Sequence, residues 1–193
     1  MHHKVVAVEA RLAHIQMLHH AVVLNRFQPR ISLVHNAISD THATMSLQLN
    51  KDNQGATRVI KASNMLSSPS ASVKNSSKRK NSAYHVDSIT MDDLRDLDAI
   101  KSWERAIIKL DIEGDESKAI LSGVKFLQSL IVPFIIMEWE FMRKTPDEEG
   151  EEVLDILQTL GYQAHTIDKE PLDDSKWRRW PNDIIWKHRS ADL

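Results

Sequence analysis

Cysteine is absent from this sequence of 193 residues. Its absence excludes disulfides, thiolate metal sites and cysteine nucleophiles, so any chemistry must use other side chains. An excess of charge of one sign is also lacking, because 25 basic and 27 acidic residues leave a net charge of −2. No overall basic field therefore exists to drive sequence-independent binding to nucleic acid or to anionic lipid. We expect no nucleic-acid partner.

Long apolar runs are missing as well. The longest, residues 131–137, is far shorter than the roughly 18 consecutive apolar residues that a membrane span needs, and it is typical of a buried strand. The first residues lack the apolar region and the cleavage site of a signal peptide. The sequence therefore predicts a soluble chain without a membrane span, cytoplasmic by default.

The composition that remains is that of an ordinary globular domain. Hydrophobic residues make up 41% and charged residues 27% of the chain, and the length suits one domain over residues 1–193. Residues 62–83 are rich in serine and have almost nothing apolar to bury. We expect this segment to be a flexible loop inserted into the domain.

The first part of the chain has the pattern of a β-α-β unit followed by a hairpin. Residues 4–9 and 31–37 are strand-like apolar runs, and residues 11–25 carry apolar side chains at helical spacing. A crossover of this length requires parallel strands, so the sequence predicts an α/β fold. Residues 44–49 and 57–62 then read as the two strands of a hairpin.

A second β-α-β unit is predicted further along the chain. Strands at 106–112 and 134–138 flank a helical pattern that begins at Glu116 and ends before Pro133. Further expected elements are a helix start at 88–94, a helix around 153–160 that ends at Gly161, a strand at 162–167 and a closing strand at 183–187.

Acidic residues follow several of these predicted strands. Glu9 ends the first strand, Asp111 and Glu113 end the strand at 106–112, and Glu138 ends the strand at 134–138. In open α/β sheets, ligands bind in the crevice beyond the carboxyl ends of the strands, where an acidic side chain commonly holds a ribose hydroxyl pair. Glu9 is therefore a candidate for nucleoside binding. The alternative is that such a residue caps the following helix or only meets water.

Residues 109–116, KLDIEGDE, alternate charged and apolar positions up to a glycine turn. This segment closely resembles the K-I-D-V-E-G-x-E signature of the FkbM family of methyltransferases, and Leu121 and Gly123 match the L-x-G that follows in the family. Other landmarks resemble the family's motifs in the same order: Val8-Glu9 resembles V-E-P, Asn25 resembles N-x-L, residues 36–39 resemble N-A-A-L-S, and residues 91–94 resemble L-D-D-L. The resemblance spans nearly the whole chain.

This resemblance implies a Rossmann-like class I methyltransferase sheet with helices on both faces. It also implies S-adenosylmethionine as the cofactor and methyl transfer to a hydroxyl-bearing acceptor, whose identity the sequence does not specify. The residues that it implies for these roles are Glu9 on the ribose, Asn36 and Ala37 near the adenine, and Asp111 and Glu113 as catalytic residues near the acceptor.

One element of the family pattern has no counterpart in this sequence. The family opens with a strand and a glycine loop that resembles D-V-G-A-N-x-G, and nothing before Lys4 matches it. The family's strand order, 3-2-1-4-5-7-6, puts that first strand at the centre, so we expect a sheet that lacks it and has two unpaired inner edges. The alternative function is therefore a non-catalytic fragment or pseudoenzyme that keeps the methyltransferase fold. A nicotinamide-dependent Rossmann enzyme is a third hypothesis, in which the 109–116 signature has no role.

Several side chains have competing interpretations. Asp111 and Glu113 have a structural alternative, in which they cap the helix near Asp115 or pair with Lys109. The ten histidines invite a metal site, but those of the first helix lack the i, i+4 spacing that puts two imidazoles on one face. We therefore predict no metal. Trp177 and Trp180 flank two arginines, and they either form an acceptor surface or pack against the sheet edge.

Overall fold

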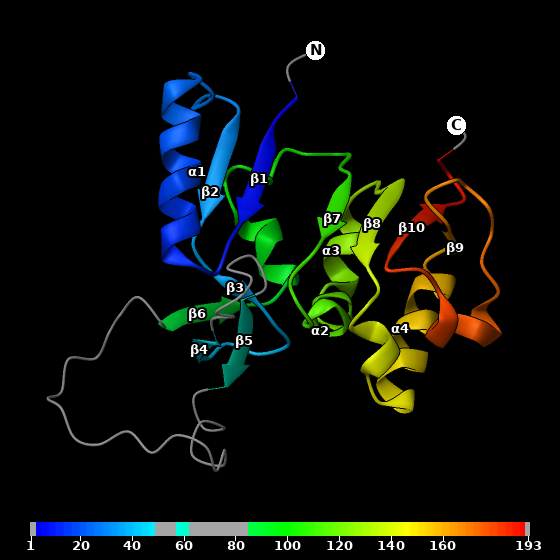
Figure 1. Cartoon of the computed structure of the whole chain (residues 1–193). Helices are drawn as coiled ribbons and strands as arrows, with labels where there is room; N and C mark the ends of the chain where they lie inside the picture. The colour runs from blue at the N-terminus through cyan, green and yellow to red at the C-terminus, as the bar shows by residue number, and fades with distance from the viewer. Residues whose placement is uncertain (1–2, 49–56, 62–84, 192–193) are drawn as a thin grey trace, which may run out of the picture. The chain divides into compact units, whose positions relative to one another are not determined.

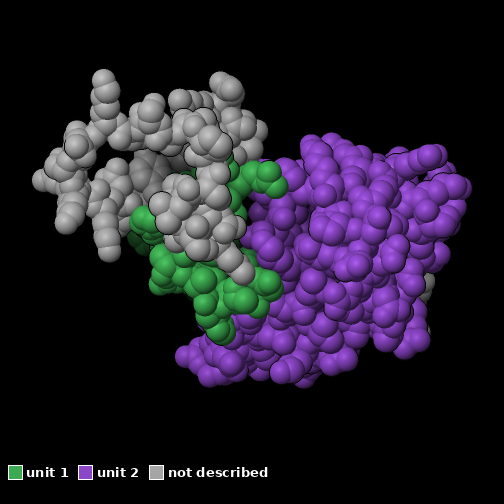
Figure 2. Space-filling model, turned by 90° about the horizontal axis from the view of Figure 1, so that it is seen from below, with its two compact units in different colours: residues 1–89 green, residues 90–193 purple. Residues whose placement is uncertain are grey.

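The computed structural model describes residues 3–48, 57–61 and 85–191 (Figure 1). The predicted serine-rich loop at 62–83 lies outside these residues. The chain divides into two compact units, residues 1–89 and 90–193, which Figure 2 shows in different colours. Both units combine helices or short helical turns with strands, so the fold is mixed α/β as predicted. Among the described residues, no helix has the length and apolar character needed to cross a bilayer.

The first unit opens with the predicted parallel β-α-β unit. Strand β1 (Val5–Val8) pairs in parallel with β2 (Ile31–Val34), and helix α1 (Leu12–Leu24) connects them (Figure 1). The helix ends at Asn25, whose side-chain amide donates a hydrogen bond to the carbonyl oxygen of Ala21 at 2.8 Å. Arg26 follows with a left-handed φ of 56°, which turns the chain toward β2.

A second sheet of the first unit contains four strands in the order β3-β6-β4-β5. They are β3 (Ala37–Ile38), β4 (Thr44–Gln48), β5 (Arg58–Lys61) and β6 (His85–Ile89). The antiparallel pairing of β4 with β5 confirms the predicted hairpin. The single strand predicted at 31–37 is instead two strands, which belong to different sheets. The small core of this sheet contains Ala37, Met45, Leu47 and Val86.

The second unit has one four-stranded sheet in the order β7-β8-β10-β9. The strands are β7 (Ile108–Leu110), β8 (Phe134–Glu138), β9 (Tyr162–His165) and β10 (Asp183–His188). Strands β7 and β8 run parallel, as predicted, whereas β10 is antiparallel to both of its neighbours. Because β10 pairs between β8 and β9, the last strand of the chain lies inside the sheet.

One face of this sheet is buried and the other is partly open. Burial alternates along β8 and β10, so that Ile135, Met137, Ile184 and Trp186 are fully buried while their neighbours Ile136 and Ile185 are half-buried. Helices α2 (Glu116–Leu121), α3 (Val124–Ser129) and α4 (Asp147–Thr159) lie on one side of the sheet (Figure 1). The periodicity of two in burial therefore distinguishes a core face from an exposed face.

The helical predictions for the second unit need two corrections. The helix start predicted at 88–94 is wrong at its beginning, because Ser88 belongs to β6, and a short 3-10 helix spans Asp92–Asp96. Thr90 does cap this turn, since its hydroxyl oxygen accepts the backbone N–H of Asp93 at 3.2 Å and its own backbone N–H donates to the Asp93 carboxylate at 2.7 Å. The long helix predicted from Glu116 is two short helices, α2 and α3, separated at residues 122–123.

The end of α4 lies where it was predicted, and the two tryptophans of residues 177 and 180 pack inside the unit and do not form an open surface. Gly161 has a φ of 90°, the left-handed conformation predicted for the residue after the helix. Trp177 and Trp180 are buried against Trp139, whose indole N–H donates to the carbonyl oxygen of Trp177 at 2.8 Å. Both rings therefore pack in the core of the second unit.

Candidate active site

Three carboxylates gather beyond the carboxyl ends of β7 and β8. Asp111 follows β7 directly, Glu113 lies in the turn after it, and Glu138 is the last residue of β8. An oxygen of each carboxylate lies within 4.8 Å of an oxygen of the other two. The parallel register, which aligns Leu110 with Met137, brings the two strand ends side by side. The structure thus groups the two predicted catalytic residues and adds Glu138, to which the sequence assigned no role.

The turn that carries Glu113 has an unusual backbone. The strand ends at Leu110, two residues before the predicted end, and Glu113 has a φ of 59° while Gly114 has a φ of 112°. A residue other than glycine persists in this left-handed region only where its surroundings hold it there. Such strain is common at functional sites.

Glu116 holds this turn in place. Its Oε1 accepts the backbone N–H of Ile112 at 2.9 Å, and its Oε2 accepts that of Gly114 at 3.0 Å. The residue is fully buried at the start of α2. Burial raises the pKa of the Glu116 carboxyl, and the backbone hydrogen bonds act in the opposite direction by favouring the carboxylate. The sequence analysis assigned no role to Glu116. Its place as the last acidic residue of the 109–116 motif is the signal that could have indicated one.

Glu138 has the most perturbed environment of the three carboxylates. Burial raises the pKa of Glu138 to about 7, and the negative charges of Asp111, Glu116, Glu113 and Glu140 add to the effect. Its Oε2 is buried and accepts no hydrogen bond within the described part of the chain. A carboxyl group with this pKa can take up or release a proton near neutral pH, as a general base or acid requires.

Asp111 also makes the ion pair that was proposed as its structural alternative. The Lys109 ammonium lies 2.5 Å from Oδ2 of Asp111, and both side chains are substantially exposed. An exposed pair of this kind contributes little to stability, on the order of 0 to 1 kcal/mol. The ion pair therefore accounts for the orientation of Asp111 but leaves its role at the site open.

The three predicted cofactor-binding residues lie in the first unit. Glu9 follows β1, and its Oε1 accepts the backbone N–H of Arg11 at 2.7 Å, while Oε2 lies 3.5 Å from Nδ1 of His14. Asn36 follows β2, and its side-chain amide donates to the carbonyl oxygen of Asp87 at 2.9 Å. Because β1 and β2 are parallel, Glu9 and Asn36 lie at the same edge of their sheet.

Ala37, the third of these residues, has a different environment. It begins β3 and is only 2% exposed, within the small core of the first unit. Its methyl group packs against other apolar side chains, so only its backbone is a possible ligand contact.

The chain is mixed α/β and has acidic side chains beyond the ends of parallel strands, the edge at which many α/β proteins bind a nucleotide or cofactor. The particular family follows from a comparison with family models. The model of the methyltransferase FkbM domain matches residues 1–164. The chain therefore belongs to the FkbM methyltransferase family, as its motifs indicated, and membership implies a methyl donor. Searches of curated proteins and of solved structures gave no match.

Proposed function

We propose that this chain transfers a methyl group from S-adenosylmethionine to a hydroxyl oxygen of an acceptor molecule. The observation that carries the proposal is the carboxylate cluster of Asp111, Glu113 and Glu138 in the second unit of a chain that belongs to a methyltransferase family. The cluster provides oxygen acceptors near the position where parallel-strand folds bind their ligands. It includes one carboxyl group with a pKa suited to proton transfer near pH 7.

The residues of the first unit fit the nucleoside part of this cofactor. A carboxylate oxygen has two lone pairs, so Glu9 can accept ribose hydroxyl hydrogen bonds while keeping its bond from the Arg11 N–H. Asn36 uses its amide nitrogen on Asp87, which leaves its oxygen as a further acceptor for the adenine amino group. Ala37 would contribute through its backbone alone, because its side chain is buried.

The residues of the second unit would act on the acceptor. When bound, S-adenosylmethionine supplies a methyl group that is already activated for transfer, so the protein must align the acceptor and remove one proton. Asp111 and Glu113 would hold the acceptor hydroxyl. Glu138 would take the hydroxyl proton and keep it on its carboxyl group while the acceptor oxygen is methylated.

The sheets also support a finer statement about the fold. Within the described residues, β1 pairs with β2 alone and β7 pairs with β8 alone. We therefore include in the proposal that each unit keeps parallel strand pairing typical of a Rossmann-like class I methyltransferase sheet, β1 with β2 in the first unit and β7 with β8 in the second.

A labelling experiment tests the proposed reaction. The protein is incubated with methyl-labelled S-adenosylmethionine and mixtures of small hydroxylated compounds, and labelled products are isolated and fragmented. We expect a methyl ether on a former hydroxyl oxygen. Label on nitrogen, carbon or a carboxyl oxygen would contradict the hydroxyl acceptor. A folded protein that binds no cofactor and transfers no label would favour the non-catalytic alternative.

Calorimetric titration tests the cofactor residues separately. Glu9→Ala should weaken the affinity for S-adenosylmethionine by about tenfold or more, because each charge-assisted hydrogen bond is worth on the order of 1.5 to 3 kcal/mol. Glu9→Gln keeps one acceptor oxygen and should have a smaller effect. Glu104→Ala, an exposed glutamate of the second unit, is the matched control. If a folded Glu9→Ala variant binds the cofactor with wild-type affinity, Glu9 has only the structural role of accepting the Arg11 N–H at the start of α1.

A further inference from the structure

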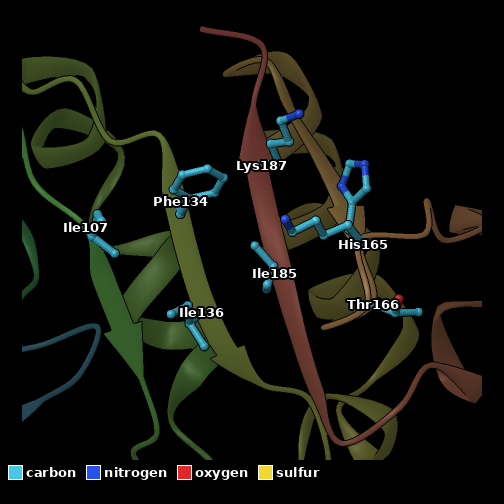
Figure 3. Close-up of a pocket in the computed structure, with 8 residues that line it drawn as sticks. Ile107, Phe134, Ile136, His165, Thr166, Ile185 and Lys187 are labelled. Atoms are coloured by element: carbon cyan, nitrogen blue, oxygen red, sulfur yellow. The ribbon is translucent and has the colours of Figure 1, made fainter. Parts of the chain in front are cut away.

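An apolar pocket of about 430 Å³ lies on the partly open face of the second unit's sheet (Figure 3). Its floor is made by Ile107, which directly precedes β7, by Phe134 and Ile136 from β8, and by Ile185 from β10. A concave apolar surface of this volume falls within the usual range for small-molecule sites, about 300 to 1,000 Å³. The pocket lies entirely within one compact unit.

Strand register explains why these side chains meet. Phe134 lies directly opposite Lys187, and Ile136 lies directly opposite Ile185. Side chains two residues apart on a strand point to the same face, so these four residues form one patch. Figure 3 shows them side by side on β8 and β10, with the helices behind the sheet. Ile107 at the margin is 64% exposed, which is unusual for a large apolar side chain.

The polar residues of the pocket carry positive or neutral groups. They are His165, Thr166, Lys169 and Lys187, and none of the described residues that line the pocket is acidic. Nδ1 of His165 lies 3.0 Å from the carbonyl oxygen of Gln163. Because a carbonyl oxygen only accepts, Nδ1 carries the hydrogen of this bond and orients the ring. The pocket therefore combines an apolar floor with two ammonium groups.

A tight turn holds Lys169 at this position. Its φ is 71°, a left-handed conformation that is costly for a residue with a side chain. The turn is closed by three hydrogen bonds: Lys169 N–H to the Thr166 carbonyl at 2.9 Å, Thr166 N–H to the Glu170 carbonyl at 2.8 Å, and Glu170 N–H to the Thr166 hydroxyl at 3.2 Å. The turn therefore fixes the backbone of Lys169 at the border of the pocket.

We infer that this pocket binds a small anionic amphiphile, a molecule with an aliphatic body and one carboxylate. The body would lie on the isoleucine and phenylalanine floor, and the carboxylate would pair with Lys169 and Lys187. Charge sets the orientation of this ligand. Lys187 lies directly opposite Phe134 on β8. Phe134 is four residues before Glu138 on the same strand, a separation of about 13 Å at roughly 3.3 Å per residue. The anion therefore lies at the lysine end and away from the carboxylate cluster, and the site does not depend on the proposed methyl transfer.

Calorimetry with matched probes tests this inference on the full chain. Decanoate carries the proposed carboxylate, decan-1-ol has the same body without the charge, and inorganic phosphate has a charge without the body. We expect decanoate to bind at least about tenfold more tightly than decan-1-ol, and phosphate not to bind. The double substitution Lys169→Met and Lys187→Met keeps the length of both side chains. It should reduce decanoate affinity to that of decan-1-ol and leave decan-1-ol unchanged.

Lys101→Met is the matched control, because Lys101 is an exposed lysine of the same unit that does not line the pocket. Equal affinities for decanoate and decan-1-ol, or unchanged decanoate affinity in the double variant, would overturn the inference. Self-association of the protein that decanoate fails to reverse would assign the patch to a second copy of the chain. Binding to phosphatidylglycerol vesicles without binding of monomeric decanoate would assign it to a lipid surface, and either result would overturn the inference.

Discussion

Asp111 and Glu113 are the residues at which the proposed catalysis is most directly tested. Asp111→Asn and Glu113→Gln keep the size of the side chains and remove the charge. We expect turnover to fall by about 10²-fold, because the acceptor hydroxyl would lose a group that positions it, with cofactor affinity nearly unchanged. Turnover, calorimetric affinity and melting temperature are measured on each variant.

The outcome separates the catalytic role from the structural alternative. A parallel loss of melting temperature and activity would assign these residues to the turn and to the Lys109 ion pair. Full turnover in both variants would also remove them from the mechanism. Lys109→Met is a useful control, because it breaks the ion pair and keeps both carboxylates.

Glu138 should give the protein a distinctive dependence on pH. Its pKa is raised to about 7, so the folded state binds a proton that the unfolded state releases near pH 4.5. Stability from this group is fully present below pH 4.5 and is lost as the pH rises through about 7. Glu138→Gln should therefore flatten the decline of melting temperature between pH 4.5 and 7.

The same substitution tests the proposed proton transfer. If Glu138 accepts the acceptor's proton, wild-type turnover should rise with pH through about 7, and Glu138→Gln should lose this rising limb. If Glu138→Gln shows the same dependence of melting temperature and turnover on pH as the wild type, another group takes the proton. Glu140→Gln serves as the comparison, since Glu140 is the last of the contributors to the raised pKa of Glu138.

Glu116 is expected to act as a positioning residue. Glu116→Ala leaves the backbone N–H groups of Ile112 and Gly114 without their acceptors, which should lower the free energy of unfolding by about 2 to 5 kcal/mol. Denaturant unfolding measures this change, with Glu148→Ala on the exposed start of α4 as control. Glu116→Gln should restore part of the stability, because its amide oxygen can still accept one of the two bonds.

At the scale of elements, close packing between α4 and the turn that carries Trp177 is the clearest constraint. Gly150 lies inside α4, and a Cβ at this position would approach Cζ2 of the Trp177 ring to 2.8 Å. An alanine in a helix is normally favoured over glycine by about 1 kcal/mol. Here we expect Gly150→Ala to destabilise the protein by about 1 to 3 kcal/mol, because overpacking outweighs the helix propensity.

Thermal unfolding monitored by near-ultraviolet circular dichroism tests this expectation, since the signal reports the packed tryptophans. Glu151→Ala, an exposed position in the same helix, is the control. An increase in melting temperature for Gly150→Ala would mean that the Trp177 ring moves at little cost.

The comparison of predicted with observed elements follows a physical rule. Strand β8 was predicted with its observed bounds, because an apolar run between Pro133 and a charged end is a local signal. Strand β6 was not predicted, because the sequence around Ser88 was interpreted as the start of a helix. The Ser88 hydroxyl instead donates to the backbone carbonyl oxygens of residues 41 and 43. These partners are 47 and 45 residues away in sequence, so no local pattern indicates them. Short strands stabilised by distant partners are the part of the fold that periodicity cannot predict.

At the scale of the whole molecule, the sequence predicts one domain over residues 1–193, and the structure divides the chain into two compact units. We expect one cooperative unfolding transition in scanning calorimetry, with equal calorimetric and van't Hoff enthalpies, because the length suits a single cooperative domain. Gly150→Ala, which alters the second unit alone, should shift this transition without splitting it. Two separate transitions would contradict the single-domain prediction.

The sequence by itself determined the parallel β-α-β units, the family and the two catalytic candidates, because these depend on local spacing and on one contiguous motif, residues 109–116. Only the tertiary structure decided which distant groups meet. The register of β7 against β8 brought Glu138 to Asp111, the burial of Glu116 placed it beneath the strained turn, and the insertion of β10 between β8 and β9 formed the apolar pocket. Strand pairing and burial depend on the whole chain, and a local periodicity carries no information about the partner that a strand or a carboxylate will find.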